Sequence, residues 1–309
     1  MPSRKANGFT LVEVLVVIAI IGVLAALLTS AISASRESSR RAACLARQQQ
    51  LAQAALEFEM SRGRFPGWRE QVGDRRRPKT VGWAFVLLPF LERKDLFRAY
   101  GPGGPRFDRQ PAEHLEMYLC PSDPPAETGG APLGYAANCG LQDGAPTPWR
   151  AADHEANGIF HDADPLLNRG KKLTRATLGY VRRGDGTSHT LLFSDRVEAR
   201  SWTDFDSERR TGILWQDTLE PAAESWINGA RPPRAASTRI EHARPSSFHP
   251  GGVNVTYADG HTQFLSDDTE YLVYCLMMTP HGAQSRRADG QPVLAVFRET
   301  ALGALADRR

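Results

Sequence analysis

An apolar run near the N-terminus constrains this chain more than any other feature. It extends from Phe9 to Leu28, and its only residues that are not plainly apolar are Thr10, Glu13 and Gly22. As an α-helix this run would be about 30 Å long, which matches the hydrocarbon core of a bilayer. The run therefore predicts a membrane-spanning helix whose single charge is Glu13.

Helix-compatible sequence continues well beyond the apolar run. No proline occurs between Pro2 and Pro66, and Gly63 is a natural helix stop. One helix over residues 9–62 would be roughly 80 Å long at 1.5 Å per residue. Its second half is weakly amphipathic, with Cys44 among the apolar positions at helical spacing.

Three interpretations of this N-terminal segment compete. A secretory signal peptide would be cleaved near the small residues at 31–35, but the apolar run is long for a signal peptide. A plain anchor fits the length, and Arg4 and Lys5 would keep the N-terminus in the cytoplasm. Neither accounts for Glu13, because a carboxylate inside a bilayer is costly. The third interpretation is a segment that is processed and then assembles with other subunits.

After Gly63 the sequence becomes rich in proline, glycine and short apolar runs, which predicts a loop-rich, mainly antiparallel β domain. Strands are expected at 116–120, 190–194 and 212–215, a short helix over 81–91, and a hairpin over 253–265. The predicted fold class is α+β, with a long N-terminal helix, half transmembrane and half amphipathic, packed on the sheet.

Residues 8–24 closely resemble the N-terminus of type IV prepilins and pseudopilins, with the sequence G-F-T-L-V-E-V-L-V-V-I-A-I-I-G-V-L. In that family a prepilin peptidase cuts after the glycine, here Gly8, and methylates the new N-terminus, here Phe9. The family's fifth-position glutamate falls on Glu13. The resemblance implies that Glu13 of one subunit neutralises the Phe9 amine of a neighbour inside the bilayer, where isolated charges are costly.

Five further islands extend the resemblance to about residue 282. They are G-W-A-F-V-L-L-P-F-L-E (82–92), Y-L-C-P-S-D (118–123), G-Y-A-A-N-C-G (134–140), D-G-T-S-H-T-L-L (185–192) and S-F-H-P-G-G-V-N-V-T-Y-A-D-G-H-T-Q-F-L (247–265). Together they resemble a large, highly paralogous bacterial family with a prepilin-type methylation segment and a C-terminal domain of unknown function, sometimes labelled solute-binding-protein-like. The domains expected are a leader at 1–8, a helix at 9–62 that spans the membrane over 9–28, a β-rich domain at 63–282 and a C-terminal extension at 283–309.

The four cysteines are Cys44, Cys120, Cys139 and Cys275, and none of them forms a C-x-x-C motif. Zinc-ribbon and thioredoxin-like patterns are therefore absent. Export of the domain would permit disulfides, and Cys120–Cys139, the pair closest in sequence, is the expected one. Four buried, reduced thiols are the alternative.

Metal-binding patterns are weak. His249, Asp259 and His261 lie on and around one predicted hairpin, but the last two straddle a turn, so their spacing does not make them converge. The alternative is that they only shape turns. The D-x-D pairs at 162–164 and 204–206 are of a kind used by calcium sites but lack the closing glutamate. Calcium stays open because some pseudopilins bind it in a C-terminal loop.

Enzyme and nucleic-acid functions are not expected. The sequence has no G-x-S-x-G elbow, P-loop or H-E-x-x-H motif, so we assign no catalytic residue. The formal net charge is only +3, and no aromatic residue interleaves the one tight basic run at 75–77.

The sequence thus predicts a single-pass inner-membrane protein with a cytoplasmic N-terminus and a C-terminal domain in the periplasm or at the cell surface. The expected partners are prepilin peptidase, other pilin-like subunits or the secretion machinery, and the lipid bilayer. The alternative is a membrane-tethered module that binds a carbohydrate or another solute, suggested by tryptophans including Trp149, Trp202, Trp215 and Trp226. Core packing is the commoner role of such aromatic residues.

Overall fold

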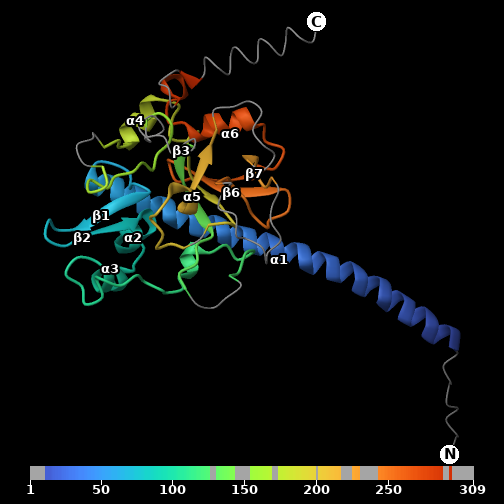
Figure 1. Ribbon diagram of the computed structural model, residues 1–309. Helices are drawn as coiled ribbons and strands as arrows, with labels where there is room; N and C mark the ends of the chain where they lie inside the picture. Colours follow the sequence, from blue (N-terminus) through green and yellow to red (C-terminus); the bar gives the residue numbers. More distant parts are fainter. Residues whose placement is uncertain are drawn as a thin grey trace, which may run out of the picture.

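Helix α1, Leu11–Arg62, is the longest element of the computed structural model, and the other described elements gather around its second half (Figure 1). Every residue from 11 to 36 on this helix is exposed, whereas Cys44, Leu51 and Phe58 are buried. The helix ends at Arg62, and Gly63 adopts a φ of +68°, which suits a glycine at a helix C-terminus. The structure describes residues 11–125, 130–142, 154–168, 173–199, 201–216, 225–229, 243–287 and 292–293.

The main sheet has five strands in the order β5-β3-β4-β6-β7. Its members are β3 Tyr135–Leu141, β4 Leu191–Asp195, β5 Gly212–Trp215, β6 Gly252–Tyr257 and β7 Thr262–Ser266. All neighbouring pairs are antiparallel except β3 and β5, which are parallel. The expected α+β fold with a long helix on a mainly antiparallel sheet is therefore confirmed.

Helices cover both faces of this sheet. Strand alternation turns Val253 and Val255 of β6 toward α6, Tyr271–Met278, with which they share one apolar core. Thr256, the next residue after Val255, points to the opposite face toward α1, where its hydroxyl lies 3.1 Å from Gln48 Oε1. The sheet is thus the middle layer between α1 and α6, and this arrangement places the polar side of β6 against the helix.

A second core lies between α1 and the segment that follows it. The hairpin of β1, Arg69–Gly73, and β2, Pro78–Gly82, leads into α2, Trp83–Leu87. The fully buried Trp83 at the start of α2 contacts the rings of Tyr118, Phe160 and Phe193.

The remaining elements are η1 Leu88–Phe90, α3 Lys94–Tyr100, η2 Glu116–Tyr118, α4 Leu178–Arg183, α5 Glu208–Thr211 and η4 Gly282–Gln284.

The strand expected at 116–120 is wrong. Residues Glu116–Tyr118 form a 3-10 turn, in which the Leu119 amide donates to the Glu116 carbonyl at 3.1 Å. The turn carries Tyr118 into the core, where its hydroxyl donates to the Ala84 carbonyl at 2.7 Å. It also directs the following Cys120 toward α1. Of the C-terminal extension expected at 283–309, the described residues include 283–287 and 292–293.

Candidate functional site

The membrane-facing part of α1 is the first candidate site. Within the described residues, α1 is the one helix long and apolar enough to cross a membrane, and its most apolar window is not buried by any other part of the chain. Glu13 lies in the first turn of the helix. Gly8 and Phe9 lie outside the described residues, so their proposed processing has no structural description.

The helix meets the globular part well beyond its apolar run. Glu37 is the first half-buried residue of α1, and Cys44 is the first buried one. Cys44 lies about 24 Å further along the axis than Leu28, the last residue of the predicted span, at 1.5 Å per residue. Groups around Cys44 are therefore outside the predicted membrane segment.

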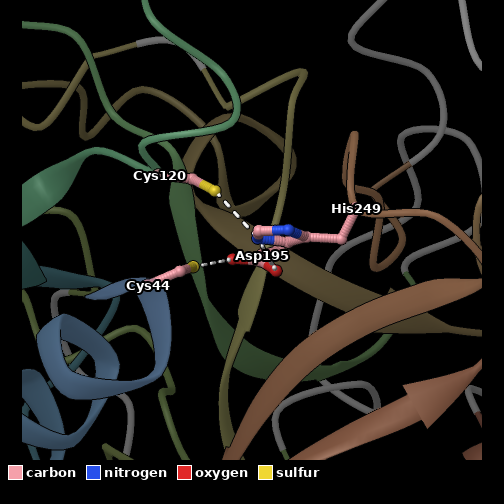
Figure 2. Close-up of side chains that lie close together, drawn as sticks. All are labelled: Cys44, Cys120, Asp195 and His249. Carbon is pink, nitrogen blue, oxygen red and sulfur yellow. Dashed lines mark hydrogen bonds and ion pairs between the residues drawn. The ribbon is translucent and has the colours of Figure 1, made fainter. Parts of the chain in front are cut away.

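The second candidate site is a set of four side chains, here called the buried cluster, which Figure 2 shows pointing toward one another. It consists of Cys44 on α1, Cys120 after η2, Asp195 at the end of β4 and His249 in the loop before β6. All four are buried, and their ligand atoms lie within 4.8 Å of one another.

Three distances define the geometry of the buried cluster. Cys44 Sγ lies 2.9 Å from Asp195 Oδ1, and Cys120 Sγ lies 3.2 Å from His249 Nε2. His249 Nε2 is also 3.9 Å from Asp195 Oδ2. The cysteine–aspartate pair joins residues 151 positions apart, and the cysteine–histidine pair joins residues 129 positions apart. The fold alone brings these groups together.

A carboxylate from α1 orients the imidazole of the cluster. His249 Nδ1 lies 2.6 Å from Glu37 Oε1. An ionised carboxylate only accepts hydrogen bonds, so Nδ1 carries the proton and Nε2 faces Cys120. Glu37 in turn accepts from Ser122 Oγ at 3.1 Å and from Arg40. The position of the ring is therefore fixed by contacts on its outer side.

Asp195 and Cys44 have supporting contacts as well. Gln48 Nε2 donates to Asp195 Oδ1 at 2.9 Å, and the Asn254 amide donates to Oδ2 at 2.8 Å. The Tyr135 hydroxyl lies 3.4 Å from Cys44 Sγ and 2.9 Å from the Leu119 carbonyl oxygen. Asp195 and Cys44 are thus both held by polar groups from α1, β3 or β6.

Burial and mutual contacts shift the pKa values of the four cluster residues in different directions. Burial raises the pKa of Asp195 to about 7 and raises the pKa of the Cys44 thiol far above its usual range. The hydrogen bond from Cys44 lowers the pKa of Cys120 to about 5, against the effect of burial. Burial would lower the pKa of His249, but its contacts with Cys120, Asp195 and Glu37 raise it to about 9. These shifts favour a proton on His249 over one on Cys120.

The metal candidates proposed from the sequence separate in the structure. His249 belongs to the buried cluster, whereas Asp259 and His261 lie at the exposed β6–β7 turn. There His261 Nδ1 lies 2.6 Å from Asp259 Oδ1, and the imidazole stacks on Tyr257 with ring centroids 4.2 Å apart. These two residues shape the turn, as the alternative interpretation expected.

The cysteines are buried thiols. The expected Cys120–Cys139 disulfide is not formed, because Cys120 faces Cys44 and His249 while Cys139 on β3 packs against Gly212 of the parallel neighbour β5. The sequence did not indicate that the Cys44 and Cys120 thiols lie close together, since their elements are far apart along the chain. It also assigned no role to Asp195.

Three of the four aspartates in the two D-x-D pairs contact arginines, and the fourth, Asp164, accepts from the Thr80 hydroxyl. Asp162 forms an ion pair with Arg69, whose Nε lies 3.1 Å from Oδ1. Asp204 and Asp206 both lie within 3.7 Å of Arg210. Neither pair forms an oxygen-rich loop of the calcium-binding type, so the structure gives calcium no support at these positions.

Most tryptophans serve the core. Trp202 and Trp215 are fully buried, and their indole nitrogens donate to the backbone carbonyls of Glu113 and Asn157. Trp226, at 38% exposure, is the one exposed tryptophan among the described residues, and Trp149 lies outside them. The aromatic basis for a sugar-binding face is thus reduced to Trp226.

Comparison with known proteins gives two family matches. A model described as "Protein of unknown function (DUF1559)" matches residues 33–271, and one described as "Prokaryotic N-terminal methylation motif" matches residues 3–29. The first range includes all four residues of the buried cluster, and the second includes Gly8, Phe9 and Glu13. Neither curated proteins nor solved structures give a match.

Proposed function

The chain belongs to the DUF1559 family and carries the N-terminal methylation motif of type IV pilin-like proteins, and from this premise we propose that it is a subunit of a type II secretion or type IV pilus-like assembly. The observation that carries the proposal is the motif on an apolar half-helix that no other described part of the chain covers. Its role would be structural.

In this proposal prepilin peptidase cuts after Gly8 and methylates Phe9. The mature N-terminus then begins at the apolar run, and its α-amine lies in the bilayer with the Glu13 carboxylate of a neighbouring subunit. Pairing two opposite charges lowers the cost of holding either one in a medium of low dielectric constant. The pair would also set the axial register between neighbouring helices.

The same proposal assigns the orientation. Arg4 and Lys5 keep the leader in the cytoplasm, residues 9–28 cross the inner membrane, and the domain beginning near residue 63 lies in the periplasm or at the cell surface. The exposed Arg36 would meet the lipid headgroups or the solvent beyond them. The family match and the apolar helix support membrane anchoring.

Intact-mass analysis of the full chain from membranes tests the processing step. Coexpression with a prepilin peptidase should remove residues 1–8 and add one methyl group, whereas a strain without the peptidase should keep Met1. A Gly8→Leu variant should stay uncut, because a large side chain at the cleavage position blocks a site built for glycine, and Asn7→Ala should be cut normally. A mature chain that begins near residue 34 would instead indicate a signal peptide.

A second function, a membrane-tethered binding module, is favoured by one hollow beside the C-terminal end of α1. It has a volume of about 360 Å³ and combines three aromatic rings with four basic side chains. Its lining residues are Phe58, Arg62, Arg64, Glu70, Gln71, Val72, Val86, Pro89, Phe90, Lys94, Phe97 and Arg98. This composition favours an acidic ligand, such as a uronic-acid saccharide. Thermal-shift measurements with acidic and neutral oligosaccharides, on wild type and Arg98→Ala, would detect it, whereas an assembly subunit alone should show no shift.

A further inference from the structure

We propose that the buried cluster is a structural Zn²⁺ site, which ties α1 to the sheet and to two loops. The proposal is independent of the assembly role, because it rests on the globular part of the chain. The four donors come from α1, the segment after η2, the end of β4 and the loop before β6.

The donor set is chemically suited to zinc. Two thiolate sulfurs, one imidazole nitrogen and one carboxylate oxygen are the ligand types that Zn²⁺ takes in proteins. Thiolates select against the hard cations Mg²⁺ and Ca²⁺, which prefer oxygen. All four side chains are buried, and together they would fill the four positions of a tetrahedral zinc ion. Closed sites of this kind are structural.

The spacing of the donor atoms fits a tetrahedral site. Zinc bonds of about 2.3 Å to sulfur and about 2.0 Å to nitrogen or oxygen require donor–donor distances of about 3.3–3.8 Å. The observed distances are 2.9 Å for Cys44 to Asp195, 3.2 Å for Cys120 to His249, and 3.9 Å for His249 to Asp195, with none above 4.8 Å. Shifts of a few tenths of an ångström to about 1 Å would bring every donor to bonding distance.

The outer contacts are those that metal ligands usually have. A metal-bound histidine commonly donates its other ring nitrogen to a carboxylate, and here Glu37 accepts from Nδ1 while Nε2 faces the cluster. The ligand carboxylate is itself hydrogen-bonded, by Gln48 and by the Asn254 amide. These contacts place the lone pair of Nε2 and the oxygens of Asp195 where a cation would bond to them.

Charge balance also favours a cation. Asp195 is fully buried, and among the described residues it pairs with His249 rather than with a lysine or arginine. Burying a carboxylate beside two sulfur groups that can ionise is costly unless a cation offsets the negative charge. On zinc binding, two protons would leave to solvent, one from Cys44 Sγ and the one shared by Cys120 Sγ and His249 Nε2, and bonds from zinc to both sulfurs and to Nε2 would take their place.

A disulfide between Cys44 and Cys120 is the competing state. Their sulfur atoms lie within 4.8 Å of each other, and an exported domain meets an oxidising environment. A disulfide would consume both sulfur ligands and leave no zinc site. The metal content and the number of thiols therefore distinguish the two states directly.

The test uses the full chain purified in detergent without chelators. Elemental mass spectrometry should find one zinc ion per chain, and alkylation after denaturation with a chelator should modify all four cysteines. A chain with no bound metal after dialysis against micromolar zinc would overturn the proposal. A peptide pair cross-linked through Cys44 and Cys120 would do the same.

Variants and cobalt substitution localise the metal. Cys120→Ser and His249→Gln should lose most of the zinc, whereas Cys139→Ser, which changes an equally buried cysteine outside the cluster, should keep it. Replacing zinc with Co²⁺ in the wild-type chain should give thiolate-to-cobalt charge-transfer absorption and the intense visible bands of tetrahedral cobalt. Retention of zinc by Cys120→Ser, or a cobalt spectrum without the charge-transfer bands, would show that the metal binds elsewhere.

Discussion

Glu37 and His249 are 212 positions apart in the chain, yet Glu37 Oε1 lies 2.6 Å from His249 Nδ1. Residues 11–36 of α1 are exposed, and Glu37 is the first residue of the helix that is half-buried by the globular part. The loop before β6 is thus tied to the base of the docked half-helix. If the cluster binds zinc, the same contact orients a metal ligand from the membrane-proximal side.

Replacing Glu37 tests this orienting role without removing a ligand. Glu37→Gln should lower the zinc affinity roughly 10- to 100-fold, which is the usual effect of losing an outer-shell partner. Competition with a chromogenic chelator measures the affinity. Glu57→Gln, which changes an exposed carboxylate on the same helix, should leave it unchanged. Equal affinities for Glu37→Gln and wild type would argue that the histidine is oriented by other contacts.

Metal removal should lower the thermal stability. A ligand that binds only the folded state, present at about 100 times its Kd, stabilises that state by about 2.7 kcal/mol, which corresponds to roughly 5–10 °C in Tm for a domain of this size. Circular dichroism melts of the full chain in detergent, with zinc or with a chelator, measure the difference. Cys139→Ser should show the same difference and Cys120→Ser should show none. A chelator-insensitive wild-type Tm would contradict the prediction.

Trp83 anchors the core between α2 and the main sheet. Its side chain is fully buried, and its ring lies 5.1 Å from that of Phe193 and 6.1 Å from that of Tyr118. Trp83→Ala should therefore lower the free energy of unfolding by about 3–5 kcal/mol. Trp226→Ala, at a 38% exposed position, should cost much less. Urea denaturation followed by circular dichroism compares them, and equal losses would argue against this assignment of the core.

Strong local patterns made part of the fold predictable. The hairpin β6–β7 has alternating residues around the turn at Ala258-Asp259-Gly260, and it forms as expected. Strand β3 was missed, because its Y-A-A-N-C-G-L sequence is buried throughout and is rich in residues with low strand propensity. An alternating pattern thus revealed the hairpin, and its absence from β3 hid that strand.

The buried cluster was only partly predictable. His249 could be selected as a metal candidate by residue type, but its partners could not, since they come from elements that meet only through the fold. Cys44 fits the apolar pattern of α1, and Asp195 follows a buried strand without any recognisable motif. The sequence instead grouped His249 with Asp259 and His261, which lie on the same predicted hairpin and which hydrogen-bond each other at the turn.

The last prediction concerns Glu13 and separates processing from assembly. Glu13→Gln removes the charge proposed to neutralise the Phe9 amine of a neighbour, so the chain should still insert and lose residues 1–8 but should assemble poorly with pilin-like subunits. Intact mass reports the cleavage, and cross-linking in membranes reports the assembly. Val14→Ala, at the adjacent position, should assemble normally, and Glu13→Asp, which keeps the charge on a shorter side chain, should be intermediate. Assembly of Glu13→Gln at the wild-type level would mean that the carboxylate does not hold neighbouring subunits together.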